Sequence, residues 1–372
     1  MIPLFKPKYN KKRIFEELDK IFDSGWTGLG PKTAEFEKAF AKRLDMPYGV
    51  FTNSCTSALH LALDALNLPK GSSVVVPDIT FVSTAAAVLY AGYIPVLAPV
   101  DDNMQLDLDF VEIQVQRLHT PAVVVVHYSG NCCDMDRLMR ICNNARDYRG
   151  KNPRIVEDCA HSCGSRYQDK PLGTFGDLAC FSFHAVKNLP IADGGMVVGK
   201  PEYEKKLRAQ RWLGIDKSTY DRTGKNYSYS YEINDLGFKS HGNDVMAVIG
   251  LANLEILDEV NVRRLEIYQR YRNELNFPIH MPRRDVVSSH HLVSCLMDER
   301  DAFIDWMNSH GISIGVHYKP LSSFDYYRRF AAENTATRSS LQFRQLATLP
   351  CFPDLTDCQQ TMIIDAANRF AS

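Results

Sequence analysis

The fold is decided by two stretches of sequence, RIVEDCAHSCG (residues 154–164) and ACFSFHAVKNLPIADGGMVVG (residues 179–199). Each stretch contains a short apolar run that predicts a buried strand, and each then continues into polar or charged residues. Ligands of open α/β sheets bind beyond the carboxyl ends of the strands. Asp158 and the segment 182–187 are therefore predicted to face one crevice.

A carboxylate and a lysine in one crevice suit pyridoxal 5′-phosphate (PLP). The amine of Lys187 can form a Schiff base with the aldehyde of this cofactor, and Asp158 can keep the ring nitrogen protonated so that the ring accepts electrons. The alternative is a solvated aspartate and a surface lysine at strand ends, which is commoner for either residue taken alone. Composition and pattern leave both interpretations open.

The flanking sequence is punctuated like that of an α/β protein. Short apolar or β-branched runs predict a mainly parallel sheet covered on both faces, with strands over residues 73–76, 122–126, 154–156, 179–183 and 196–198. Apolar residues at helical spacing predict a helix over residues 56–66, entered through the N-cap sequence Thr52-Asn53-Ser54.

A longer helical pattern runs from Asp244 to Arg272 and could bridge two domains. We therefore predict a large domain over residues 1–245, which includes the N-terminal segment, and a smaller domain over residues 246–372. Residues 214–231 mix lysine, tyrosine and small polar residues without periodicity. They predict a long functional loop, and the lysine and tyrosine content of residues 216–231 would suit a nucleotide diphosphate.

The composition is that of an ordinary globular chain and excludes disorder, fibres and small disulfide-stapled modules. Of the 372 residues, 45% are hydrophobic and 23% charged, and the net charge is −1. A polyanionic partner must therefore be held by local groups, because no global positive field attracts nucleic acid or anionic lipid. The ten dispersed cysteines, without a signal peptide or a long apolar run, predict reduced thiols in a cytoplasmic protein and no metal cluster.

Six sequence blocks resemble, in their order, the signature of the DegT/DnrJ/EryC1/StrS family of PLP-dependent sugar aminotransferases. They are SGWTGLGP (24–31), NSCTSAL (53–59), PDITFVST (77–84), EDCAH (157–161), FSFHAVKN (181–188) and GVHYKPL (315–321). The similarity runs from about Ile2 to the C-terminus. It implies an α/β architecture of fold type I, similar to aspartate aminotransferase, with a mixed, mainly parallel sheet in the large domain and a small C-terminal α+β domain. It also implies a homodimer with active sites at the interface.

The resemblance assigns four cofactor contacts. Lys187 would be the Schiff-base lysine and, once released, the general base, since burial and a nearby cation lower the pKa of a lysine. Asp158 would pair with the ring nitrogen. His161 matches a family position near the phenolic oxygen, and Phe81 matches the aromatic residue that stacks on the ring. For His161 and Phe81 a purely structural role is the alternative.

The resemblance also suggests how the cofactor phosphate is held. Cys55 and Thr56 lie at the start of the predicted helix, where free backbone N–H groups and the helix dipole attract anions, and Ser182 would add a hydroxyl. Many relatives have a Gly-x-Asn-x-Arg segment that reaches the phosphate of the partner subunit. In this chain Lys239 stands at the Asn position and His241 at the Arg position, and either could supply a donor.

The candidates on the substrate side are Trp26, His184, His317 and Tyr318, each with packing as the alternative. Relatives that aminate C4 of a keto sugar often have a His after Phe-Ser-Phe and a Ser-Gly-Trp sequence near the N-terminus, which His184 and Trp26 match. The C3-acting subgroup more often has Tyr or Phe followed by Pro-Thr-Lys. Ser322 departs from the family pattern, because relatives often have a substrate-contacting His there.

The implied reaction is a ping-pong transamination in which an amino acid, with L-glutamate expected, gives its nitrogen to the cofactor. A nucleotide-linked 4-keto-6-deoxyhexose then accepts it, for amino-sugar and surface-polysaccharide biosynthesis. One alternative is a C3 aminotransferase. A sugar dehydratase of the same family would have His in place of Lys187, and a non-catalytic PLP-binding regulatory protein would lack Lys187 or Asp158.

Overall fold

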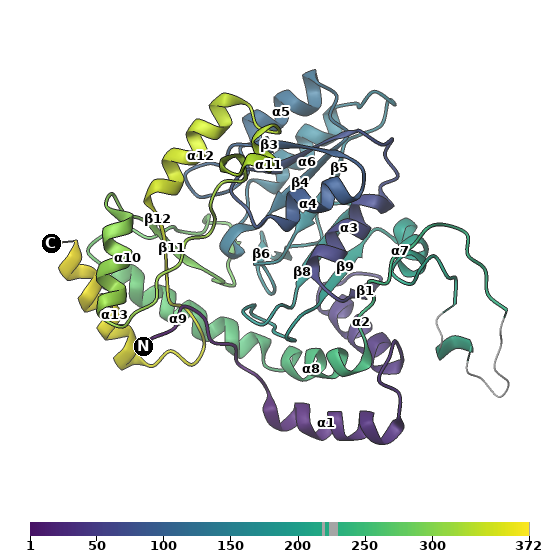
Figure 1. The fold of residues 1–372 in the computed structure, drawn as a ribbon, viewed down its shortest axis with the longest axis horizontal. Coiled ribbons are helices and arrows are strands. Elements are labelled where there is room, and N and C mark those ends of the chain that lie inside the picture. Colours follow the sequence, from purple (N-terminus) through teal and green to yellow (C-terminus); the bar gives the residue numbers. More distant parts are fainter. Residues whose placement is uncertain (218–219, 223–229, 372) are drawn as a thin grey trace.

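The computed structural model describes residues 1–217, 220–222 and 230–371 (Figure 1). Of the loop predicted over residues 214–231, residues 218–219 and 223–229 lie outside the described residues. Its predicted role towards a nucleotide diphosphate therefore falls partly outside them. The described ends of this segment run side by side, since Ile215 and Ile233 form an antiparallel bridge.

The centre of the molecule is a seven-stranded sheet in the order β1-β9-β8-β5-β4-β2-β3 (Figure 1). Its strands are β1 (Gly49–Thr52), β2 (Ser73–Pro77), β3 (Ile94–Ala98), β4 (Ala122–Val126), β5 (Arg154–Asp158), β8 (Leu178–Ser182) and β9 (Gly195–Gly199). The strands from β3 to β8 in this order are parallel, and β9 is antiparallel to both neighbours. This confirms the predicted α/β class with its mixed, mainly parallel sheet.

Helices cover both faces of the sheet. One face carries α3 (Cys55–Ala65), α4 (Ser83–Tyr90) and α7 (Glu204–Gln210). The other face carries α2 (Pro31–Arg43), α5 (Leu108–Arg117), α6 (Met135–Asn144) and α8 (Asp244–Leu254). Helix α1 (Lys11–Ser24) packs against α8. The sheet is thus enclosed between two helical layers, as the continuous apolar strands predict.

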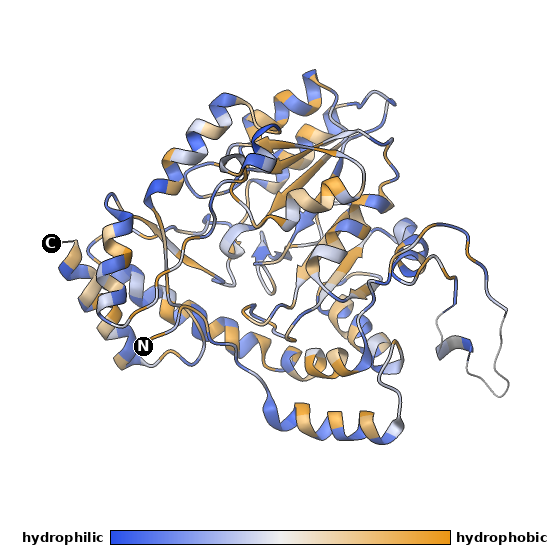
Figure 2. Ribbon diagram, viewed as in Figure 1, coloured by the Kyte–Doolittle hydropathy of each residue, from blue (hydrophilic) through white to orange (hydrophobic). Residues whose placement is uncertain are grey.

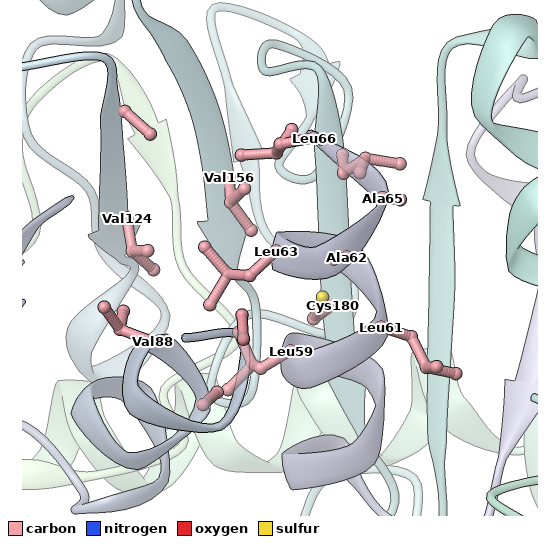
Figure 3. Packing of buried hydrophobic residues seen from close by; sticks show 14 of the residues in the cluster. Leu59, Leu61, Ala62, Leu63, Ala65, Leu66, Val88, Val124, Val156 and Cys180 are labelled. Carbon is pink, nitrogen blue, oxygen red and sulfur yellow. The ribbon is translucent and has the colours of Figure 1, made fainter. Parts of the chain in front are cut away.

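Successive side chains of each strand point to opposite faces of the sheet, so each strand contributes buried residues to both helical layers. Val124 of β4 and Val156 of β5 lie in one buried cluster with Leu59 and Leu63 of α3 (Figure 3). Ile155, the neighbour of Val156 in the chain, joins the cluster on the opposite face. Figure 2 shows the result, with apolar residues along the strands and polar residues on the outer sides of the helices.

Another apolar core lies apart from the clusters that cover the two faces of the central sheet. It surrounds the antiparallel pair of β11 (Val293–Leu296) and β12 (Leu346–Leu349), and it includes Ile2 from the N-terminus. Its helices are α9 (Leu257–Glu274), α10 (Arg300–Ser309) and α13 (Asp357–Phe370). The remaining described strands and α-helices are β6 (Arg166–Tyr167), β7 (Lys170–Pro171), β10 (Val286–Val287), α11 (Asp325–Arg328) and α12 (Glu333–Gln345).

The single helix predicted from Asp244 to Arg272 is wrong, because two helices occupy this stretch. Helix α8 ends at Leu254 and α9 begins at Leu257. The buried Asn253 side chain holds the last turn of α8 by donating to the Pro190 carbonyl at 2.6 Å and accepting from the Asn10 N–H at 2.9 Å. No Gly or Pro marks this break in the sequence. The division into domains at residue 245 stays a prediction.

The helices and the cysteines bear on the predictions from composition. Among the described residues, no helix is long and apolar enough to cross a membrane. All ten cysteines are free, and eight of them are buried. Buried free thiols of this kind behave as small apolar residues.

Candidate active site

A cavity of about 380 Å³ opens beyond the carboxyl ends of β4, β5 and β8. Ten of the thirteen predicted site residues line it: Cys55, Thr56, Phe81, Asp158, His161, Ser182, His184, Lys187, His317 and Tyr318. They come from separate segments that the sheet topology brings to one edge, as expected for a ligand site of an α/β protein.

Asp158 ends β5 and is buried at the cavity. Its Oδ2 accepts a hydrogen bond from Thr84 Oγ1 at 2.8 Å, and its Oδ1 accepts one from the Ala160 N–H at 3.1 Å. Burial raises the pKa of this carboxyl, although both hydrogen bonds favour the ionised form. Because both donors are neutral, the negative charge is available to a cation bound in the cavity.

Lys187 lies in the loop between β8 and β9, and its side chain is partly buried in the cavity wall. Burial lowers the pKa of Lys187 to about 8; Cys55 and Asp158 act in the opposite direction, and Arg264 adds to the lowering. An amine with this pKa is partly neutral near physiological pH. Lys187 can therefore act both as a nucleophile and as a base.

The first turn of α3 forms an anion site at the cavity. Ser54 caps the helix by accepting from the Ser57 N–H at 3.1 Å, which leaves the first two helical N–H groups without an intrahelical partner. Thr56 Oγ1 and Ser83 Oγ lie 2.7 Å apart and add two hydroxyls. A Cβ at Gly195 would lie 2.5 Å from the Ser54 carbonyl oxygen, so glycine is needed for β9 to approach this turn.

His161 orients Tyr318. The Ser129 N–H donates to His161 Nδ1 at 3.3 Å, and His161 Nε2 lies 3.0 Å from the Tyr318 hydroxyl. Since Nδ1 accepts a hydrogen bond, Nε2 carries the ring proton and donates a hydrogen bond to the Tyr318 hydroxyl oxygen. The Tyr318 O–H group is then left to donate to a ligand. The Phe81 ring, 56% exposed, lies 5.9 Å from the Tyr318 ring. The direct cofactor contacts of His161 and Phe81 stay predictions.

Trp26, Lys239 and His241 do not line the cavity. The Trp26 ring lies 5.1 Å from the Tyr220 ring. Lys239 Nζ lies 5.3 Å from the centre of the Trp212 ring, and the His241 ring lies 4.6 Å from the same ring. The predicted contacts of Lys239 and His241 concern a partner subunit, so a single chain leaves them as predictions.

Several residues that surround these groups were not predicted from the sequence. Thr84 and Ser83 belong to the quoted block 77–84, so their position next to Phe81 in the chain was an available signal. His291 approaches Lys187 from 104 positions further along the chain, and no spacing rule points to it. The His291 ring stacks on Phe5, a contact that only the tertiary fold determines.

Ser322 has a structural role in place of the His expected from relatives. Its N–H and its hydroxyl donate to the two carboxylate oxygens of Asp78, at 2.7 and 2.6 Å, and all these groups are buried. Asp78 directly follows β2. These two bonds therefore tie the segment that carries His317 and Tyr318 to the carboxyl end of β2.

The sequence match decides the family. Residues 8–368 match the DegT/DnrJ/EryC1/StrS aminotransferase family. The chain belongs to this family. Its fold and its enzyme class are those of the PLP-dependent sugar aminotransferases, which confirms the resemblance inferred from the six sequence blocks.

Relatives and solved structures match over almost the whole chain. The spore coat polysaccharide biosynthesis protein SpsC of Bacillus subtilis is 31% identical over 380 residues, 98% of this chain and 96% of SpsC. Spr1654 of Streptococcus pneumoniae, assigned as a sugar aminotransferase and solved in a PMP form, has a TM-score of 0.90 at 28% identity, covering 99% and 98% of the two chains. The sugar aminotransferase CalS13 of Micromonospora echinospora has a TM-score of 0.88 at 27% identity, covering 99% and 100%.

The residues of the cavity fit PLP, the cofactor of this family, which is also bound in another form of Spr1654. A neutral anion site at α3 suits its phosphate, the Lys187 amine with its lowered pKa suits its aldehyde, and the buried Asp158 carboxylate suits a protonated ring nitrogen. This chain therefore needs no global positive charge to hold a phosphorylated cofactor.

Proposed function

We propose that this aminotransferase moves an amino group from L-glutamate to C4 of a nucleotide-linked 4-keto-6-deoxyhexose, for the synthesis of amino sugars of surface polysaccharides. The observation that carries the proposal is the cavity that brings Lys187 and the buried Asp158 together with His184, His317 and Tyr318. The name of the relative SpsC supports the polysaccharide context.

Lys187 would attach PLP through Nζ, Asp158 would pair with its ring nitrogen, and the α3 hydroxyls and N–H groups would hold its phosphate. When bound, PLP supplies an electrophilic carbon and an electron sink for carbanion chemistry. In this cavity the neutral Lys187 Nζ accepts the proton of the carbon that carries the amino group. The Asp158 carboxylate stabilises positive charge at its end of the cavity. It is buried, and electrostatic attraction is stronger in a low-dielectric surrounding than in water.

One feature favours C4. His184, which directly follows Phe183 and is exposed at the cavity, matches the residue common among C4-acting relatives. The hydroxyl proton of Tyr318, left for a ligand by His161, would suit a sugar oxygen in a C3 or a C4 substrate alike. A C3 aminotransferase is the second candidate and shares the same cofactor residues.

Loss of the visible absorbance band on addition of glutamate tests the proposal. The purified, PLP-loaded protein should be yellow, and the band should fall with L-glutamate because the nitrogen has moved to the cofactor. A nucleotide-linked 4-keto-6-deoxyhexose should then restore it. A band indifferent to every amino donor would refute transamination, and recovery with 3-keto sugars alone would assign C3 instead.

We also propose a homodimer with active sites at its interface. Exposed apolar side chains support this proposal, with Phe15 and Phe22 of α1 exposed by 69% and 62%, and Leu236 by 79%. Apolar surface of this kind is stabilised by burial against a second copy. Sedimentation equilibrium should give twice the mass of the chain, and replacing Phe15 and Phe22 by Ser should shift the equilibrium towards monomer. A monomeric wild-type protein that is fully active would contradict the proposal.

The free thiols support a cytoplasmic location, as inferred from the sequence. Eight of the ten cysteines are buried and none is paired. Such thiols persist in reducing compartments. Fractionation of cells should find the protein with soluble cytoplasmic markers, and its recovery from an oxidising compartment would contradict this inference.

A further inference from the structure

Behind the cavity, Lys187 belongs to a buried hydrogen-bond network. Lys187 Nζ lies 3.4 Å from His291 Nε2, at the long end of hydrogen-bonding range, and His291 Nδ1 lies 3.0 Å from Asn188 Oδ1. His291 is buried and is not among the residues that line the cavity. It can therefore influence the chemistry through Lys187 and not by touching a ligand.

The network determines which nitrogen of His291 carries the proton. Asn188 Nδ2 uses both of its hydrogens, donating to Asn261 Oδ1 at 2.7 Å and to the Ser289 carbonyl at 2.8 Å. Asn188 Oδ1 is therefore an acceptor, and His291 Nδ1 must carry the ring proton and donate it. His291 Nε2 is left as an acceptor that faces Lys187 Nζ.

Several elements hold His291 in this position. Arg264 of α9 donates to the backbone carbonyls of His290 at 3.4 Å, His291 at 3.2 Å and Cys351 at 2.8 Å. Phe5 stacks on the His291 ring, with 5.8 Å between centroids and 9° between planes. A side chain fixed in this way is pre-organised to hold its partner.

We propose that His291 is a positioning residue for Lys187, whose amine donates a hydrogen bond to His291 Nε2 whenever its nitrogen is not bonded to the cofactor. The inference rests on the proposed role of Lys187. An acceptor of this kind favours the ammonium over the neutral amine, because hydrogen bonds from charged donors are stronger. Burial holds the pKa of His291 well below its ordinary value, so the ring stays neutral and keeps its lone pair.

Other charged or titratable groups also act on this pair. They are Cys55, Asp158, His161, Arg264 and His317, from α3, β5 and its following loop, α9 and the segment before α11. They remain the same when His291 alone is replaced. A change in the pKa of Lys187 on that replacement therefore reports the contact with His291.

Two variants at position 291 separate the acceptor from the rest of the ring. In His291→Asn the short amide can still donate to Asn188 but ends before Lys187. In His291→Gln the longer amide places an oxygen near the position of Nε2. His290→Asn is the matched control, since the His290 ring is also buried but stacks on Tyr268 at 4.1 Å.

The measurement is the rate at which cofactor-free protein takes up PLP, followed by absorbance across pH, with circular dichroism to verify folding. Because the neutral amine reacts, the midpoint reports the pKa of Lys187 and should lie near pH 8 in the wild type. Loss of a hydrogen bond to the ammonium should lower the midpoint by about one pH unit in His291→Asn. The His291→Gln and His290→Asn variants should stay close to the wild type.

An unchanged midpoint in folded His291→Asn would overturn the proposal. If His291→Asn does not fold, His291→Gln decides. The glutamine keeps an acceptor oxygen near the position of Nε2, so a midpoint lowered by a full pH unit in this variant would contradict the acceptor role. Uptake of PLP that gives the same absorbance band in Lys187→Ala would instead refute the assignment of Lys187. Failure of the positioning role and failure of the proposed function are thus distinguishable.

Discussion

Replacing Lys187 by alanine should lower the turnover of amino-group transfer by about 10⁴-fold, the upper end of what one positioned proton-transfer group contributes. The Lys187 amine is the group at the cavity whose pKa, about 8, allows it to attach PLP and to carry a proton near neutral pH. The defect should appear directly in single-turnover measurements with glutamate, in which the loss of the absorbance band is the readout. The band itself should also shift, because the covalent link to the protein is absent.

The Lys187→Ala variant should fold as well as the wild type. Burial lowers the pKa of Lys187 in the folded protein below its ordinary value. The ammonium form is therefore disfavoured by folding, and this cost is largest below the folded pKa and disappears as the pH rises above the ordinary value. Removing the amine relieves this cost at neutral pH, so the melting temperature of the cofactor-free protein should stay the same or rise.

Lys38→Ala is the matched control for this prediction, since Lys38 is an exposed residue in the middle of α2. It should leave both turnover and melting temperature unchanged. A small primary amine added to Lys187→Ala should restore part of the proton transfer by occupying the space of the lost side chain. Full activity of Lys187→Ala without such an amine would show that another group is the base.

Five of the seven strands of the central sheet, all except β1 and β3, could be predicted, because each is marked by an apolar run in the local sequence. Val123, Val124 and Val125 of β4 are buried on both faces, so the run is apolar without interruption. The break between α8 and α9 could not be predicted, because it depends on Asn253 meeting Pro190 and Asn10 from distant parts of the chain. Tertiary contacts override a helical pattern that is continuous in sequence.

The same distinction applies to the site. Asp158 ends β5 and Lys187 comes after the adjacent strand β8, so the rule that ligands bind at the carboxyl ends of parallel strands was enough to predict that they share one cavity. Their chemical roles needed the family resemblance, since an aspartate and a lysine at strand ends are individually commonplace. The contact between His291 and Lys187 could not be predicted, because the position of His291 depends on Phe5 and on Arg264 of α9, which only the tertiary fold brings to it.

Asp158→Asn should lower turnover by roughly 10²–10⁴-fold, since removing one partner of a buried charge pair costs about 3–5 kcal/mol. The asparagine has nearly the same shape and can still accept from Thr84 or Ala160 through one oxygen. The main loss is the negative charge that the protonated ring nitrogen of PLP requires. Steady-state turnover with glutamate and a keto sugar nucleotide measures the effect.

The stability of Asp158→Asn should move the other way. Burial raises the pKa of Asp158, so the ionised carboxylate is disfavoured by folding, and this cost is present above the folded pKa and lost as the pH falls through it. At neutral pH the cofactor-free variant should therefore melt at the same or a higher temperature than the wild type. The rise in melting temperature on adding PLP should shrink, because the variant binds the cofactor less tightly.

Asp177→Asn is the matched control, and the pair of variants separates cofactor chemistry from general damage. Asp177 is also a buried aspartate, but its Oδ1 lies 2.9 Å from an Arg154 guanidinium nitrogen and 2.7 Å from Lys200 Nζ, away from the cavity. Asp177→Asn should lower the melting temperature, since it breaks these ion pairs, while turnover per folded molecule stays near the wild-type value. Equal losses of turnover in both variants would mean that Asp158 acts only through the fold, and its pairing with the ring nitrogen would have to be abandoned.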